Sequence, residues 1–291
     1  MNKEKIILAL FVLLTLGACA QKKDAYRSPD GYDLSRPVRY PMPEVLKEIS
    51  GIDFHEGNPD TLYAEQDEEG RVFMVRPGEK KVTHVKFAGK GDYEDIALVG
   101  GYVVMLRSDG VLYDFPFPEL RAGEIKNTRK WEDLLPRGEY ESLYGDPRTG
   151  TLFLLTKDSR EDSRTHAVSG YELSLADDGE ITLKRGFSFR TDKLESYPGM
   201  HHKDFRCSAL AKDTRTGQWY ILASVNKMLV VTDSLFRVRE VCPLDPSRFP
   251  QPEGIAFDRD GALYISNEGD KTTPGTVLKF AWQGAGRSAH K

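Results

Sequence analysis

The chain has 291 residues, of which 39% are hydrophobic and 30% are charged, and its formal net charge is −4 at pH 7. This composition indicates a packed protein rather than a disordered one, and the length allows one large domain or two smaller ones. A mildly acidic chain without a basic run is poorly suited to bind nucleic acid, so we expect no nucleic acid among its partners.

The N-terminus has the pattern of a bacterial lipoprotein signal. Lys3 and Lys5 form a basic start, a largely apolar run covers residues 6–16, and small residues precede Cys19. This run is too short for a membrane-spanning helix, which needs about 20 residues. We predict a signal peptide over residues 1–18 and acylation of Cys19 with chains such as palmitate. An ordinary secretory signal with a chance cysteine is the alternative.

Acylation would make the chain a lipid-anchored membrane protein of the cell envelope, on the periplasm-facing side of the outer membrane. Residues 19–43 show no clear periodicity and are predicted to form a tether. Within this tether, residues 33–40 include Val38 and Tyr40 in an extended context, and they are a candidate strand.

A short sequence motif, polar in its first residues and apolar in its last ones, occurs five times in the rest of the chain. We call each copy a phrase. They occupy residues 49–53, 93–97, 140–144, 207–211 and 252–256. Aligned on their second residues, at positions 50, 94, 141, 208 and 253, they are spaced by 44, 47, 67 and 45 residues. A period of about 40–50 residues with several strands per unit is typical of a β-propeller. We therefore predict an all-β propeller domain over residues 44–285.

Each phrase begins the first strand of a blade, and strand-like segments follow it. Second strands are predicted at 62–65, 103–106, 152–155, 219–222 and 263–266, and third strands at 71–75, 111–115, 169–175, 228–232 and 276–280. Weaker fourth strands are predicted at 82–87, 181–189 and 238–241. The fifth repeat ends near Trp282 without a fourth strand, so we expect residues 33–40 to supply it and close the ring.

Five blades are favoured over six. The long third repeat holds a charged insert at residues 158–164 and a segment at 191–205, and we assign both to loops. A sixth blade would have to come from weak segments such as 120–135 and 186–205. Segments 146–150, 213–217 and 258–261 each begin with Asp and end with Gly, which predicts tight hairpins rather than calcium loops. Cys207 and Cys242 fall at distant places of one blade and are expected to be buried free thiols.

The repeat also predicts where a site lies. In a blade the first strand lines the axis and the second runs antiparallel to it, so the start of one and the end of the other share one face near the channel. The first location holds Ser50, Glu94, Glu141, Ser208 and Glu253, and the second holds Gln66, Asp67, Arg107, Thr156, Lys157, Ser224, Asn267 and Glu268. We predict ligand binding by Gln66, Asp67, Arg107, Lys157, Asn267 and Glu268.

Carboxylates gathered at one opening are costly unless something compensates their charge. Arg107 and Lys157 could pair with Glu94 and Glu141, respectively. Calcium could instead be held by Glu94, Glu141 and Glu253 with nearby oxygens, which makes these three the candidate metal ligands. A third interpretation is structural: the polar residues only cap a water-filled channel. His201, His202 and Asp204 form a weaker candidate for a transition-metal site.

Several phrases resemble the SdiA-regulated family of bacterial envelope propellers. The similarity spans about residues 44–281 and is strongest at 48–52, 63–70, 93–97, 249–257 and 263–269. The resemblance implies a propeller, is compatible with bound calcium, and supplies no agreed catalytic residues. A more distant likeness to propeller phytases implies a calcium-dependent phosphoesterase.

Two functions follow from these patterns. The first is an anchored propeller that binds a small ligand, a glycan or a protein through its polar axial face. The alternative is a metal-dependent hydrolase of a phosphoester or lactone, with Glu94, Glu141 or Glu253 as metal ligand or general base. The sequence carries no serine-hydrolase, zincin, phosphate-loop or dinucleotide motif, so it leaves open whether the protein is an enzyme.

Overall fold

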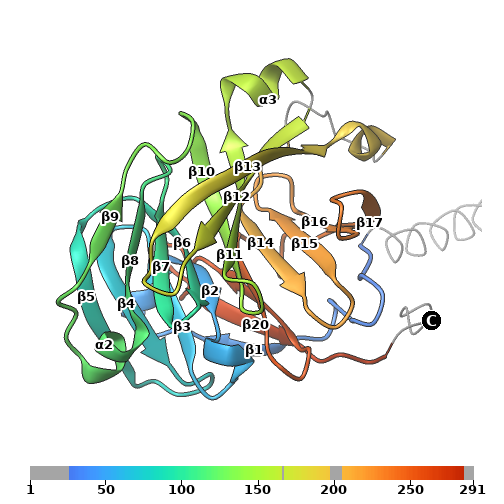
Figure 1. The fold of residues 1–291 in the computed structure, drawn as a ribbon. Helices are drawn as coiled ribbons and strands as arrows, with labels where there is room; N and C mark the ends of the chain where they lie inside the picture. Colours follow the sequence, from blue (N-terminus) through green and yellow to red (C-terminus); the bar gives the residue numbers. More distant parts are fainter. Residues whose placement is uncertain (1–25, 166, 197–204, 285–291) are drawn as a thin grey trace, which may run out of the picture.

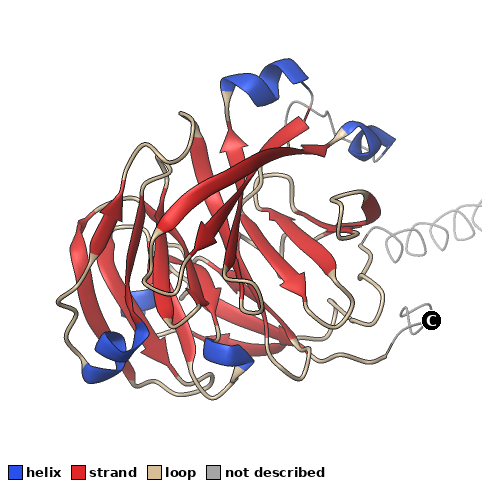
Figure 2. Cartoon of the chain, viewed as in Figure 1, coloured by secondary structure: helices blue, strands red, loops and turns tan. Residues whose placement is uncertain are grey.

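The computed structural model describes residues 26–165, 167–196 and 205–284. Five four-stranded antiparallel sheets stand as blades around a common axis, and the few helices lie at the ends of strands (Figures 1 and 2). The fold is therefore an all-β propeller with five blades, as the repeat predicts. No helix within the described residues is long and apolar enough to cross a membrane.

The blades follow the chain in order, and the innermost strand of each comes from one repeated phrase. Blade 1 is β2 (Ile49–Asp53), β3 (Leu62–Gln66), β4 (Glu69–Val75) and β5 (Val82–Lys90), and blade 2 is β6 (Tyr93–Val99), β7 (Tyr102–Arg107), β8 (Leu112–Pro116) and β9 (Arg129–Trp131). Blade 3 is β10 (Glu139–Asp146), β11 (Thr151–Asp158), β12 (Ala167–Leu175) and β13 (Ile181–Arg190). Blade 4 is β14 (Ala209–Asp213), β15 (Gln218–Ala223), β16 (Met228–Thr232) and β17 (Val238–Pro243).

Blade 5 combines both ends of the propeller. It contains β18 (Pro252–Phe257), β19 (Leu263–Asn267) and β20 (Thr276–Phe280), and its outer strand is β1 (Val38–Pro41). Val38 pairs with Lys279 and Pro41 with Thr276. The predicted closure of the ring by an N-terminal strand is thus confirmed. Strand β1 covers the edge of β20 and becomes the outer strand of the blade.

The segments that a sixth blade would have required belong to other elements. Residues 120–135 contain the end of helix α2 (Phe117–Ala122) and strand β9, and β9 completes blade 2. The start of residues 186–205 belongs to β13, which is followed by the short helix η3 (Asp192–Ser196). The other helices are η1 (Glu44–Leu46), η2 (His55–Gly57) and α3 (Arg160–Thr165), and α3 projects beyond the ring between β11 and β12 (Figure 1).

The propeller takes in more of the N-terminal segment than its closing strand. Tyr32 is fully buried among Tyr220, Phe257 and Trp282, although it lies in the stretch predicted as a tether. Its hydroxyl donates to the carbonyl of Gly261 at 2.8 Å. The buried Tyr32 therefore adds a second contact between the N-terminal segment and the propeller, beside the pairing of β1 with β20.

Near the axis, hydrogen bonds between short side chains of one blade and backbone atoms of the next connect neighbouring blades. The Ser50 hydroxyl donates to the Glu94 carbonyl, and the Ser208 hydroxyl donates to the Pro252 carbonyl. The Asp53 carboxylate accepts from the Leu98 amide at 2.7 Å. Because an inner strand has no partner on its axial side, such bonds satisfy backbone groups that the sheets leave unpaired.

The three Asp-to-Gly hairpins have the predicted structure. Asp146, Asp213 and Asp258 each accept a backbone amide of their own turn. Gly150, Gly217 and Gly261 close these turns with φ of 63°, 74° and 80°, which L side chains rarely adopt. Cys207 and Cys242 are free and buried, as predicted.

Candidate ligand-binding face

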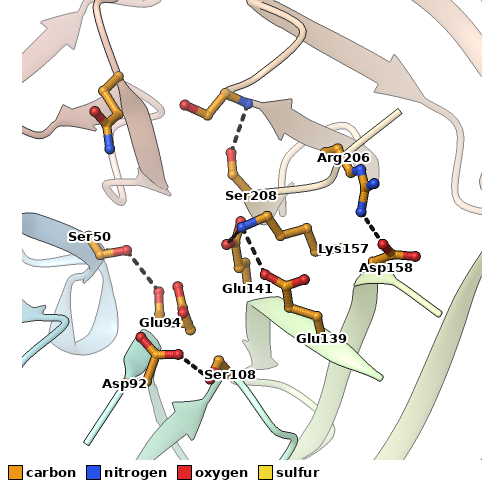
Figure 3. A network of polar contacts seen from close by, with 12 residues as sticks. Ser50, Asp92, Glu94, Ser108, Glu139, Glu141, Lys157, Asp158, Arg206 and Ser208 are labelled. Atoms are coloured by element: carbon orange, nitrogen blue, oxygen red, sulfur yellow. Dashed lines mark hydrogen bonds and ion pairs between the residues drawn. The ribbon is translucent and has the colours of Figure 1, made fainter. Parts of the chain in front are cut away.

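The starts of the inner strands and the ends of the second strands form one polar face around the axis, which we call the axial face. Glu94, Glu141 and Glu253 occupy equivalent places there. Each is the extra residue of a β-bulge, because the residues before and after it pair with consecutive residues of the second strand. Bulges re-aim side chains and occur often beside functional sites. The bulges thus present one carboxylate from each of three blades to the same opening, where the charge of Glu253 acts on both Glu94 and Glu141. Figure 3 shows Glu94 and Glu141 there.

These carboxylates are desolvated and repel one another. Burial, followed by repulsion from Glu141, raises the pKa of Glu94 to about 9. Burial raises the pKa of Glu141 to about 7, although the bond from Lys157 lowers it. Burial also raises the pKa of Glu253. The face therefore carries more acidic groups than its surroundings can stabilise in the charged form.

Lys157 is the main internal counter-charge. Its ammonium donates to the Glu141 carboxylate and lies 3.1 Å from that of Glu139 (Figure 3). The predicted pairing of Lys157 with Glu141 is therefore present. The suggested pairing of Arg107 with Glu94 is not formed. Arg107 instead donates two hydrogen bonds to the Asp109 carboxylate, from Nε at 2.8 Å and from Nη2 at 2.6 Å. The tight turn after β7 places Asp109 next to the Arg107 side chain.

The part of the axial face between blades 5 and 1 holds polar groups without partners. Asn267 is fully buried, and neither its side-chain nitrogen nor its side-chain oxygen has a hydrogen-bond partner. One carboxylate oxygen of Asp67 is also buried without a hydrogen-bond partner. Burial raises the pKa of Glu268 to about 8, and repulsion from Glu253 and Asp67 adds to this effect. Gln66 is buried as well, and its side-chain oxygen accepts the Glu68 amide at 2.7 Å. Unpaired buried polar groups are costly, so this part is suited to receive a polar ligand.

The sequence reasoning missed a second row of polar residues on this face. Glu48, Asp92, Glu139, Arg206 and Gln251 each lie two residues before a predicted axial residue. Glu139 contacts Lys157, Arg206 pairs with Asp158, and Gln251 bonds Glu268. The repeat alignment itself contained the signal, because each of these polar residues directly precedes one of the five phrases.

The arrangement does not fit a calcium ion between Glu94, Glu141 and Glu253. Calcium requires about six or more oxygen ligands at 2.3–2.6 Å. Within the described ranges, no three His, Cys, Asp or Glu side chains are gathered to hold a metal ion. Lys157 places an ammonium among these carboxylates. His201, His202 and Asp204 lie outside the described residues.

The comparisons with known proteins agree with the fold and with the family resemblance. The SdiA-regulated family model matches residues 193–271, which confirms the resemblance. No curated protein matches the sequence. Similar solved structures include Myxococcus xanthus glutaminyl cyclase, with a TM-score of 0.55 and 13% identity over 84% of this chain and 94% of that one.

Two further structures have the same level of similarity. A luciferin-regenerating enzyme has a TM-score of 0.53 and 13% identity over 86% of this chain and 97% of that one. Regucalcin from Agrobacterium tumefaciens, described as a calcium-binding protein, has a TM-score of 0.50 and 13% identity over 85% of this chain and 95% of that one. At such identities the likeness shows a shared propeller fold alone.

Proposed function

We propose that this protein is a lipid-anchored envelope propeller that binds a small, positively charged organic ligand, an amine or a guanidine, at its axial face. The observation that carries the proposal is the part of the face between blades 5 and 1. There the fully buried side chain of Asn267 has no hydrogen-bond partner, at the end of the strand that Glu268 follows. The desolvated Glu268 lies close enough to Glu253 and Asp67 for their charges to raise its pKa.

A cationic ligand supplies what this part of the face lacks. An ammonium or guanidinium group offers hydrogen-bond donors to carboxylates and relieves their mutual repulsion. The Asn267 oxygen can accept a further donor, and its nitrogen can bond a ligand oxygen. Lys157 illustrates the same chemistry at Glu141 and Glu139, on the blade 3 side of the axis.

Binding of putrescine, a small diamine, tests this proposal. We expect calorimetric titration of the full-length protein at pH 7.5 to show millimolar or tighter binding, because both partners gain charge compensation. Glu268→Gln should weaken it about fivefold, whereas Asp60→Asn, an exposed carboxylate in the η2–β3 loop, should leave it unchanged.

Calcium and a neutral polyol at the same concentrations are the comparison ligands. Calcium is the inorganic alternative, because carboxylate oxygens are the ligands that it prefers. Stronger binding of calcium than of putrescine, with loss in Glu141→Gln, would favour the predicted metal site. Equal responses to putrescine and to the polyol would contradict a cation-binding face.

One observation favours the hydrolase alternative. A carboxyl group with a pKa near 7, as burial produces at Glu141, has the proton affinity that a general base needs at neutral pH. Hydrolysis of p-nitrophenyl phosphate or of a simple lactone that is lost in Glu141→Gln would support this second function.

The anchor rests on the N-terminal sequence pattern, and residues 1–25 lie outside the described part. We expect Cys19→Ala to move the protein from the membrane pellet to the soluble fraction after cell lysis, because the acylated residue is lost. Immunoblotting of the two fractions measures this change, with Ser28→Ala as a control. Retention of the Cys19→Ala variant in the pellet at the parent's level would show that the lipid is not the anchor.

A further inference from the structure

A cavity of about 340 Å³ lies at the opposite end of the inner strands from the axial face. Its wall is built from the second halves of β2, β6, β10, β14 and β18 and from the residues that follow them, whereas the axial face is built from the starts of the same strands. The volume falls within the range of pockets that take small molecules, and every blade contributes to it.

The wall of the cavity is mainly apolar. One branched aliphatic residue of the lining comes from the equivalent position of each inner strand, and its side chain also packs in the core between blades: Ile52, Ile96, Leu143, Leu210 and Ile255. Nearer the rim, Phe54, Leu98 and Phe257 extend this lining. Such a wall favours the apolar part of a ligand, because burying its surface there removes it from water.

The charged groups around the cavity differ in whether they are free to meet a ligand. The Asp53 carboxylate accepts the amides of Leu98 and Phe54, both at 2.7 Å. Asp258 accepts from its own turn and from Tyr264, and the Lys279 ammonium lies 3.6 Å from it. Both lining aspartates are thus already engaged.

One cation at the cavity is free to meet a negative ligand group. Arg259 is exposed at the rim and has no ion pair among the described residues. Lys212 also lines the cavity, but its ammonium is already paired with Asp146 at 3.1 Å. One exposed carboxylate, Glu56, lines the cavity as well. Arg259 is therefore the cation placed to meet an anion held over the apolar wall.

We propose that this cavity is a second ligand site, independent of the axial face, which binds a small apolar molecule carrying a carboxylate. The apolar part lies against the apolar lining of the cavity, and the carboxylate lies at the rim near Arg259. The two ends of the channel then select opposite charges, since the axial face is acidic.

Octanoate is the probe for this site, with octanamide and octylammonium as its neutral and cationic counterparts. In calorimetric titrations of the full-length protein, we expect octanoate to bind with a millimolar or lower Kd and octanamide about tenfold more weakly. Arg259→Gln should weaken octanoate binding about fivefold by removing the rim charge. Arg137→Gln, an exposed arginine that does not line the cavity, is the matched control.

A blocking variant makes the test specific. Thr214 is exposed in the turn after β14 and lines the cavity, so Thr214→Trp should obstruct the mouth without burying a new group in the core. We expect this variant to lose octanoate binding and to keep putrescine binding at the axial face. Absence of octanoate binding to the parent, unchanged binding in Thr214→Trp, or equal binding of all three probes would overturn the proposal.

Discussion

Tyr32→Ala is expected to lower the free energy of unfolding by about 3–5 kcal/mol, the usual cost of removing a fully buried aromatic side chain. Tyr32 packs against Trp282 at a ring-centroid distance of 5.2 Å, and its hydroxyl accepts from Arg215 at 2.8 Å. The substitution would leave a cavity and remove a partner of Arg215 at the point where the two chain ends meet. For a domain of this size we expect the melting temperature to fall by about 10 °C.

The matched control for this prediction is Tyr26→Ala, which removes the same side chain from a position that is 50% exposed. Deleting residues 20–42 should destabilise the protein further, because it also removes β1 and exposes the edge of β20. Differential scanning calorimetry measures all three variants. If the deletion melts at the parent's temperature, the N-terminal segment is a tether and not part of the ring.

Lys157→Met is expected to destabilise the protein by about 2–3 kcal/mol at pH 8, because it leaves the buried Glu141 carboxylate without its ammonium partner. Glu94→Gln should have the opposite effect and stabilise the protein by about 1–2 kcal/mol at this pH, since it removes a carboxyl group whose charged form the folded protein disfavours. Urea denaturation of both variants measures these changes. Lys130→Met, which removes an exposed lysine of β9, serves as the control.

The pH dependence distinguishes this explanation from a simple packing defect. The pKa of Glu94 is about 9 in the folded protein and close to its ordinary value of 4.5 in the unfolded chain. The folded state therefore holds more protons between these values, and its stability falls as the pH rises through this range. Glu94→Gln should flatten this fall. The Lys157→Met defect should shrink below about pH 6, where Glu141 can be protonated. A defect equal at pH 5 and pH 8 would contradict the electrostatic role of Lys157.

The repeated phrases of the sequence determined that the fold is a β-propeller. Their spacing favoured five blades over six, and the missing fourth strand of the last blade indicated closure near Val38. The fourth strand of blade 2, β9, was not predicted. The same alignment placed Glu94, Glu141 and Glu253 on one face, because equivalent residues of a repeat occupy equivalent places around an axis. Blade geometry is local, so a sequence pattern records it well.

The partners of individual side chains were decided by the tertiary structure. Arg107 bonds the nearby Asp109 rather than Glu94, and Lys157 bridges Glu139 as well as Glu141. These choices depend on distances of a few ångströms between groups, which a repeat period does not specify. The burial of Tyr32 and the cavity at the far end of the channel also depend on the tertiary structure. Both arise only when the ring closes and brings residues distant in the chain against one another.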